Sequence, residues 1–265
     1  MTSSLEVRVA ARDVEVLTAY VPIPPSGMLP VNAFLLRAEQ PVLVDTGMRA
    51  SRDDFVERLA SLVDLDELRW VWLSHTDPDH IGSLEQVLAR AKRARVVTTF
   101  LGMGKLGLLG LPTDRVFLLN PGQSLDVGDR RLLALKPPVF DAPETTGFFD
   151  TKTRALFSAD CFGALLEHPA EAADDIEPAA LREGLVTWAT VDAPWLSWVE
   201  PTKLERALDE VRKLEPSVVL SGHLPPAKGI TASLLAHLAE ARLAEPHIGM
   251  DQAAFERLLE SAAPR

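Results

Sequence analysis

The segment at residues 73–83, LSHTDPDHIGS, holds two histidines and two aspartates within six positions. These are His75, Asp77, Asp79 and His80. Imidazole nitrogens and carboxylate oxygens bind divalent first-row metal ions, and a carboxylate can bridge two of them. Alternate side chains of an extended loop point toward one side, and Pro78 favours an extended backbone at Asp77. The spacing predicts a metal-binding loop; the alternative is a solvated acidic turn.

Aspartates and histidines also stand at the ends of other hydrophobic runs. These are Asp45 at the end of VLVD, Asp160 at the end of ALFSAD, His223 at the end of VVLSGH, and Asp141 just past LLALKPPVF. Because strand ends at one edge of an α/β sheet converge, we expect these side chains to lie beside the 73–83 segment. Such a cluster would hold two ions about 3.5–4 Å apart, with an oxygen species between them.

The elements that must position these residues follow an alternating pattern, which predicts one α/β domain with mixed sheets covered by helices. Runs rich in β-branched residues predict strands at residues 5–9, 14–20, 31–36, 41–47, 69–74, 95–99, 115–120, 130–136, 154–160 and 217–223. Helical spacing predicts helices at residues 51–63, 82–94, 202–214, 231–244 and 251–262. Ser51 is the expected N-cap of the first helix, and Thr202 with Glu205 forms an expected capping box on the third.

The acidic segment at residues 166–200 stands apart from this alternation. It carries Trp188, Trp195 and Trp198. One interpretation is a helical lid or insertion whose tryptophans cover the site and exclude water. The other is a surface helix pair whose tryptophans pack in the core.

The composition restricts the expected compartment and partners. Asp+Glu 38 against Lys+Arg 27 gives a net charge of -11, which disfavours nucleic acid and anionic membranes as partners. We find no apolar run long enough for a membrane span and no apolar core of a signal peptide. The single cysteine, Cys161, fits a reducing compartment, so we expect a cytoplasmic protein. A homodimer is expected only because it is the commonest assembly.

These residues make the sequence similar to the metallo-β-lactamase superfamily. The resemblance covers nearly the whole chain, and it is carried by VLVDTG, the 75–80 motif, LFSAD and SGH. It implies a four-layer αβ/βα sandwich formed by residues 1–265 as one domain, with a dinuclear metal site. By position in the motif, one ion would be held by His75, Asp77 and Asp141, the other by Asp79, His80 and His223, and Asp160 would bridge them.

Two positions depart from the usual pattern of that superfamily. Asp77 stands where the second histidine of the motif is expected, and Asp141 stands at the expected place of a further histidine. A carboxylate in the second position resembles the His-x-Glu-x-Asp-His motif of flavodiiron proteins and their oxygen-binding di-iron relatives. That branch implies two irons that handle oxygen or nitric oxide, with electrons delivered by a flavodoxin-like domain. No phosphate-cradling glycine loop follows His223, so we expect electrons from another protein, or a site that only senses.

Charge favours the same branch independently of the resemblance. Replacing two histidines with aspartates takes the formal charge of the ligands from about −2 to about −4. Added negative charge stabilises harder ions, so iron or manganese gains over zinc. It also weakens the Lewis acidity that a hydrolase needs.

Several neighbouring residues have two readings. Asp45 either fixes the tautomer of a ligating histidine or caps the turn that follows it. Thr145 and Thr146 either donate to the site or serve the local backbone. Cys161, next to Asp160, is either a redox group or a small core residue. The remaining histidines, His168, His237 and His247, are expected at the surface.

Three functions remain open at this stage. The first is a di-iron oxidoreductase or oxygen-binding protein. The second is a metal-dependent hydrolase of a small ester, lactone, thioester or phosphodiester, in which Asp79 would orient the nucleophile. The third is a non-catalytic di-iron gas sensor.

Overall fold

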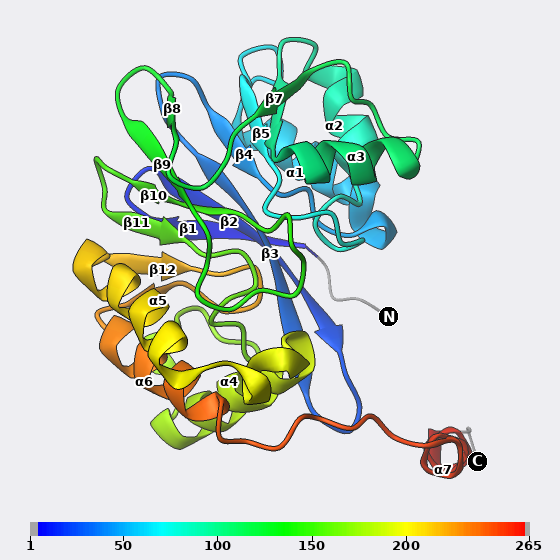
Figure 1. Cartoon of the computed structure of the whole chain (residues 1–265). Coiled ribbons are helices and arrows are strands. Elements are labelled where there is room, and N and C mark those ends of the chain that lie inside the picture. Colours follow the sequence, from blue (N-terminus) through cyan, green and yellow to red (C-terminus); the bar gives the residue numbers. More distant parts are fainter. Residues whose placement is uncertain (1–4, 263–265) are drawn as a thin grey trace.

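Two β-sheets face each other in the computed structural model, which describes residues 5–262 (Figure 1). Sheet A has the strand order β1 (Glu6–Ala11), β2 (Val14–Pro22), β3 (Met28–Leu36), β4 (Val42–Val44), β5 (Trp70–Trp72), β6 (Arg95–Thr98) and β7 (Val116–Leu118). Strands β1 to β4 pair antiparallel, whereas β4 to β7 pair parallel. Parallel neighbours require crossover connections, and these contain α1 (Arg52–Leu62), α2 (Leu84–Arg90) and α3 (Phe100–Leu108).

Sheet B is built by the second half of the chain. Its order is β13 (Ala227–Lys228), β12 (Val218–Leu220), β11 (Ala155–Phe157), β10 (Gly147–Asp150), β9 (Arg131–Leu135) and β8 (Ser124–Asp126). Only β11 and β12 pair parallel. The helices of this half are α4 (Pro178–Asp192), α5 (Pro201–Leu214), α6 (Thr231–Ala241) and α7 (Gln252–Ala262). Short 3₁₀ helices lie at Arg49–Ser51, Ala173–Asp175 and Pro194–Trp198.

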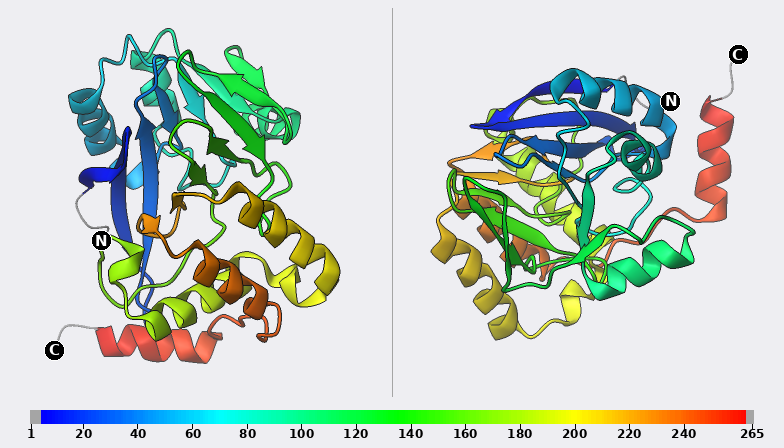
Figure 2. Two further views of the ribbon diagram at one scale, coloured as in Figure 1. Left: turned by 90° about the vertical axis from the view of Figure 1, so that its left-hand side faces the viewer. Right: turned by 90° about the horizontal axis from the view of Figure 1, so that it is seen from above.

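Three apolar clusters hold the layers together and confirm the four-layer αβ/βα sandwich (Figures 1 and 2). Between the sheets, the Trp72 and Phe148 rings lie 4.6 Å apart, and Phe148 stacks on Phe157 at 4.2 Å. A second cluster joins sheet A to its helices, with Phe55 fully buried. The third joins sheet B to α4, α5 and α6, with Leu208 fully buried. By contrast, α7 lies at the edge of the molecule after an extended segment (Figure 2).

Most of the predicted helices and strands are present, but their first and last residues differ from the prediction, and the structure contains further elements that the pattern does not predict. The sequence pattern predicts no element in the glycine- and leucine-rich segment at residues 100–112, but this segment contains α3. Thr99 caps that helix by accepting a hydrogen bond from the Gly102 amide. The helix expected at residues 82–94 is only the seven-residue α2. Strands β8 and β10 were not expected; each is short and lies in a turn-rich part of the sequence.

Of the two predicted helix caps, the N-cap position of Ser51 is confirmed, whereas the capping box of Thr202 and Glu205 is wrong. Ser51 occupies the N-cap position of α1, but its hydroxyl donates to the Met48 carbonyl at 3.2 Å instead of capping the helix. The third helix begins at Pro201, because proline is preorganised for the first helical position and lacks an amide to satisfy. Thr202 is therefore inside the helix, where its hydroxyl donates to the Glu200 carboxylate.

The segment at residues 166–200 forms one α-helix and short 3₁₀ turns rather than a helix pair. Leu181, Leu185 and Ala189 of α4 are buried in the cluster outside sheet B. This packing fixes α4 in the outer helical layer. None of the described helices is long and apolar enough to cross a membrane.

Candidate metal centre

Parallel strands β4 and β5 place the first half of the site. Their register pairs Val44 with Trp72, and the next amide, that of Asp45, donates to the Trp72 carbonyl at 2.9 Å. The Asp45 carboxylate accepts from the Ser74 amide at 2.8 Å and from its hydroxyl at 2.7 Å. These bonds fix the chain at the point where the 75–80 motif begins.

Parallel strands β11 and β12 place the second half in the same way. The Gly222 amide donates to the Ala159 carbonyl at 2.8 Å, so Asp160 and His223 follow from adjacent strand ends. Asn32 of β3 joins this edge to sheet A. The backbone amide of Asn32 donates to the Gly222 carbonyl at 2.9 Å, and its side-chain amide donates to two carbonyls of the 221–224 loop.

The seven expected ligands converge. They are His75, Asp77, Asp79, His80, Asp141, Asp160 and His223. The Asp160 carboxylate is central, because its oxygens lie 3.5, 3.2 and 3.1 Å from Nε2 of His75, His80 and His223. Asp79 Oδ2 lies 3.4 Å from His80 Nε2 and 3.5 Å from His223 Nε2.

The ligand atoms also separate into the two expected sets. Within each set, one atom from every residue lies within 4.8 Å of the others. The sets are His75, Asp77 and Asp141, and Asp79, His80 and His223. The structure thus brings together the residues assigned to each ion, while their ligation remains a prediction.

Three buried atoms of the cluster suit a bound cation. His75 Nε2, His80 Nε2 and Asp160 Oδ1 have no hydrogen-bond partner within the described part of the chain. A buried polar atom without a partner costs about 1–3 kcal/mol. Because all three are metal-ligating atom types that face one another, the donor set fits divalent or trivalent ions.

The opposite ring nitrogens are held by hydrogen bonds. His80 Nδ1 lies 2.9 Å from Asp45 Oδ2, and His223 Nδ1 lies 2.8 Å from the Pro30 carbonyl, to which it must donate. A proton on Nδ1 leaves Nε2 free to coordinate a metal. Of the two roles expected for Asp45, the structure shows the contact with a histidine.

The charged groups of the cluster act strongly on one another. Burial opposes a charged imidazole, but attraction by Asp160 and other carboxylates raises the pKa of His80 well above its usual value. The same competition raises the pKa of His223 to about 9. Burial alone would raise the pKa of Asp160, yet the histidines hold it well below its usual range. The carboxylates and imidazoles of the cluster therefore shift one another's pKa values in opposite directions.

Asp192, the last residue of α4, is a further member that sequence reasoning missed. Its oxygen lies within 4.8 Å of ligand atoms of Asp141 and Asp160. Burial, then the charges of Asp160 and Asp141, raise the pKa of its carboxyl to about 8. Its signal was weak, because it ends a helix rather than a strand. Helical spacing from Trp188, four residues earlier, could have indicated it.

The loop that carries Asp141 is fixed by its own polar groups. The Thr145 hydroxyl donates to Asp141 Oδ1 at 3.3 Å, so it contacts a site residue. The Lys136 ammonium donates to three carbonyls of residues 142–145. The Thr146 amide donates to the Ser74 carbonyl at 2.8 Å and links this loop to the 75–80 segment. Cys161 is buried, and burial raises the pKa of its thiol, which favours the core reading.

The three tryptophans behave differently. The Trp188 ring lies 4.8 Å from the His223 ring and covers one side of it. Trp195 donates to the Phe140 carbonyl at 3.0 Å, next to Asp141. Trp198 is 86% exposed, so it neither packs in the core nor encloses the cluster.

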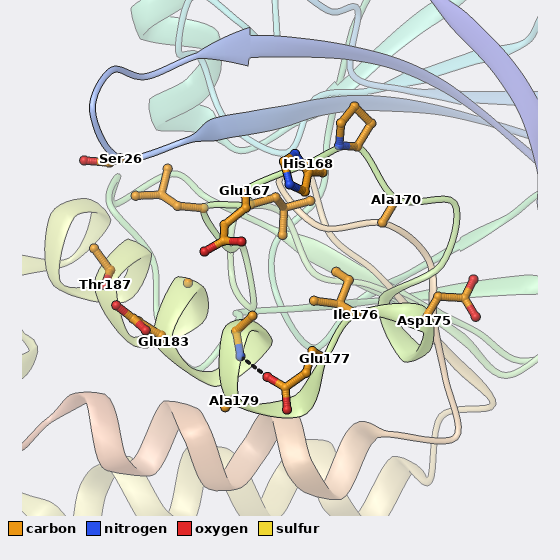
Figure 3. A pocket seen from close by; sticks show the side chains of 15 residues that line it. Ser26, Glu167, His168, Ala170, Asp175, Ile176, Glu177, Ala179, Glu183 and Thr187 are labelled. Carbon is orange, nitrogen blue, oxygen red and sulfur yellow. Dashed lines mark hydrogen bonds between the residues drawn. The ribbon is translucent and has the colours of Figure 1, made fainter.

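A cavity lies on another face of α4. It has a volume of about 710 Å³ and is bordered by the β2–β3 hairpin, residues 165–170 and α4 (Figure 3). Glu177 caps α4 there by accepting from the Ala180 amide at 2.9 Å, and Glu183 and His168 face the cavity (Figure 3). His168 and His247 are exposed and His237 is half-buried, all outside the Asp and His cluster.

Residues 29–223 match the model of a family described as ODP family beta lactamase. Among curated proteins, the anaerobic nitric oxide reductase flavorubredoxin of Pectobacterium carotovorum is 29% identical over 134 residues. That alignment covers 50% of this chain and 27% of the flavorubredoxin. The chain therefore matches about a quarter of the length of this relative.

Solved structures show the same architecture. The flavodiiron protein of Giardia intestinalis superposes with a TM-score of 0.78 at 19% identity, covering 91% of this chain and 60% of the other. The rubredoxin oxygen:oxidoreductase of Desulfovibrio gigas gives a TM-score of 0.78 at 16% identity, covering 90% and 61%. At these identities the likeness shows the fold, that of the lactamase-like part of flavodiiron proteins.

Proposed function

Because the chain belongs to the ODP family of beta-lactamase-like proteins, we propose that its Asp and His cluster holds two irons and acts on or senses O2 or NO. The observation that carries the proposal is the set of three buried, unpartnered ligand atoms on His75, His80 and Asp160. Relatives named as a nitric oxide reductase and as an oxygen:oxidoreductase support these two gases as candidates.

The proposed ligands divide as the distances suggest. One iron would be held by His75, Asp77 and Asp141, the other by Asp79, His80 and His223, and Asp160, which lies near residues of both sets, would be shared. Four carboxylates with three neutral imidazoles carry a formal charge of −4. That charge stabilises hard, highly charged ions, which supports iron, with manganese next, over zinc.

The chain's own residues position and shield such a centre. When bound, a pair of irons supplies electrons to a diatomic gas. Asp45 holds His80 through Nδ1, and the Pro30 carbonyl holds His223, so both rings keep Nε2 directed into the cluster. Trp188 covers the His223 ring and limits water on that side.

Electrons would come from a separate donor protein. The flavodiiron and rubredoxin-linked names of the structural neighbours support this part of the proposal. A cytoplasmic location and a homodimer remain predictions from the sequence. A single domain over residues 1–265 and a lid role for residues 166–200 are also proposals.

Metal analysis of protein purified without oxygen tests the centre. We expect about two irons per chain and a spectrum that changes when NO is added. Asp77→Ala and Asp141→Ala should each lower metal occupancy while the circular dichroism spectrum stays unchanged. If Asp141→Ala binds both ions normally, the assignment of Asp141 is wrong.

The competing functions give different results in the same preparation. Stoichiometric zinc together with hydrolysis of a small ester, lactone, thioester or phosphodiester would overturn the iron proposal. Reduction of O2 or NO with an added electron donor identifies an oxidoreductase. Reversible spectral changes without turnover, even with the donor present, identify a sensor.

A further inference from the structure

Asp192 reaches the cluster from a different layer than the other acidic residues. The strand-end ligands come from the loops of the two sheets, whereas Asp192 is the last residue of α4. One of its oxygens lies within 4.8 Å of ligand atoms of Asp141 and Asp160. Three carboxylates from three separate elements therefore share one small volume.

The position is unfavourable for an anion in the absence of a cation. The C-terminal end of a helix carries partial negative charge, which repels a carboxylate there. The charges of Asp141 and Asp160 add to that repulsion. Within residues 5–262, no lysine or arginine forms an ion pair with any of the three carboxylates. Histidines lie near Asp141 and Asp160, but a bound cation would offset the repulsion at all three carboxylates together.

Two buried atoms beside this volume support a bound ion there. Asp160 Oδ1 is buried and has no hydrogen-bond partner in the described chain, and the same is true of His75 Nε2. His75 Nε2 lies 3.9 Å from Asp141 and 3.5 Å from Asp160, so it faces the same carboxylates as Asp192 does.

The helix holds Asp192 in place. Trp188, one helical turn earlier, packs against the His223 ring at 4.8 Å, and residues four apart lie on the same helix face. The preceding turns are anchored by Leu185 and Ala189 in the core outside sheet B. The buried helix therefore holds the backbone of Asp192 beside the cluster.

We propose that Asp192 is an additional ligand of the ion on the Asp141 side. This inference rests on the proposed dinuclear centre and deepens it. The ion would then have one imidazole, that of His75, and four carboxylates, whereas the other ion has two imidazoles and two carboxylates. Since carboxylates suit manganese and iron better than zinc, the two positions would differ in metal preference.

Manganese titration tests the proposal without any turnover assay. Mn²⁺ added to metal-free protein is followed by loss of the free-ion EPR signal. We expect two Mn²⁺ per wild-type chain, and in Asp192→Asn a loss of at least about tenfold in affinity at one of the two positions. Glu183→Gln is the matched control, because Glu183 lies on the same helix but faces the cavity. It should titrate like wild type.

The outcomes separate this inference from the proposed function. If wild type and Asp192→Asn bind two ions equally well, Asp192 is not a ligand, although the dinuclear centre stands. If wild type binds no Mn²⁺ and no iron, both proposals fail. Should Asp192→Asn not fold, an anomalous-scattering map of wild-type crystals soaked in Mn²⁺ decides. An Asp192 oxygen at bonding distance from a manganese peak supports the proposal. If both Asp192 oxygens lie farther from every manganese peak, the proposal is overturned.

Discussion

At the scale of single residues, the site depends on how each imidazole is held. Asp45 lies behind the cluster rather than in it. Its carboxylate contacts Nδ1 of His80, the ring nitrogen that points away from the cluster, and accepts from the amide and the hydroxyl of Ser74. Its backbone has a φ of +58°, which aspartate tolerates better than most residues. Residues of this kind act on metal affinity through the ligand that they orient.

Asp45→Asn should weaken metal binding by about 10- to 100-fold while leaving the fold intact. The amide keeps the size of the side chain but loses the charge that favours a proton on His80 Nδ1. Competition with a chelator measures the change. Asp53→Asn, at a side chain that is 93% exposed, is the control. Equal affinity in wild type and Asp45→Asn would contradict the expected role.

At the scale of elements, a buried arginine links the two sheets far from the metal centre. Arg130, just before β9, bonds Asp13 between β1 and β2, Asp150 at the end of β10, and its neighbour Asp129. Its side chain is 1% exposed, so its charge depends wholly on these partners. Such a network is costly to break from one side, because it leaves the buried Asp150 carboxylate without a counter-charge.

Arg130→Met should lower the free energy of unfolding by about 3–5 kcal/mol. Urea denaturation of the metal-free protein measures it without contributions from bound ions. The next residue, Arg131, is exposed, so Arg131→Met is a matched control with an expected effect within about 0.5 kcal/mol. A similar decrease in the free energy of unfolding in both variants would show that the Arg130 network stabilises the fold no more than an exposed arginine does.

The same network predicts a pH dependence. Hydrogen bonds from Arg130 and then from Lys152 hold the pKa of Asp129 below its usual range, against the effect of burial. A carboxyl with a lowered folded-state pKa stabilises the fold above its unfolded pKa of about 4, and this contribution is lost as the pH falls below that value. Wild type should therefore be more stable than Asp129→Asn at pH 6, and the difference should shrink toward pH 2–3. Melting temperatures of both proteins, measured across this pH range, check the prediction. A difference in melting temperature that stays constant with pH would contradict it.

At the scale of the whole molecule, the proposed ligands come from both halves of the sandwich. The 75–80 segment follows β5 of sheet A, whereas Asp160 and His223 follow strands of sheet B. Ions that bind only the folded chain stabilise it by mass action. Bound ions would therefore stabilise the packing of the two sheets against each other, in addition to any role in the reaction.

Removal of metal should lower the melting temperature. At a free ion concentration of about 100 times Kd, each ion contributes about 2.7 kcal/mol that a chelator would abolish. Differential scanning calorimetry of the loaded and chelated protein measures the change. In Asp160→Ala, which removes the central carboxylate, the two curves should coincide. A metal-dependent shift of wild-type size in that variant would place the ions elsewhere.

Much of this arrangement could be predicted from the sequence, for a definite reason. Asp45, His75, Asp160 and His223 each end a hydrophobic run, and parallel pairing of β4 with β5 and of β11 with β12 brings such ends together. Asp192 was not predicted because its approach to the cluster depends on how α4 packs on sheet B, and only its helical spacing from Trp188 pointed to it. Ser51 takes the predicted N-cap position of α1, but the capping box at Thr202 failed because that helix begins one residue earlier, at Pro201.

The bonds from Asn32 to the 221–224 loop also bear on the order of events during biosynthesis. A nascent chain exposes the 75–80 motif long before the ribosome has made His223, some 190 positions after Asn32. Until that late segment reaches β3, the imidazole that closes the centre has no fixed place. Assembly of the complete proposed centre would thus follow synthesis of the His223 segment, because a shorter nascent chain lacks one of the proposed ligands.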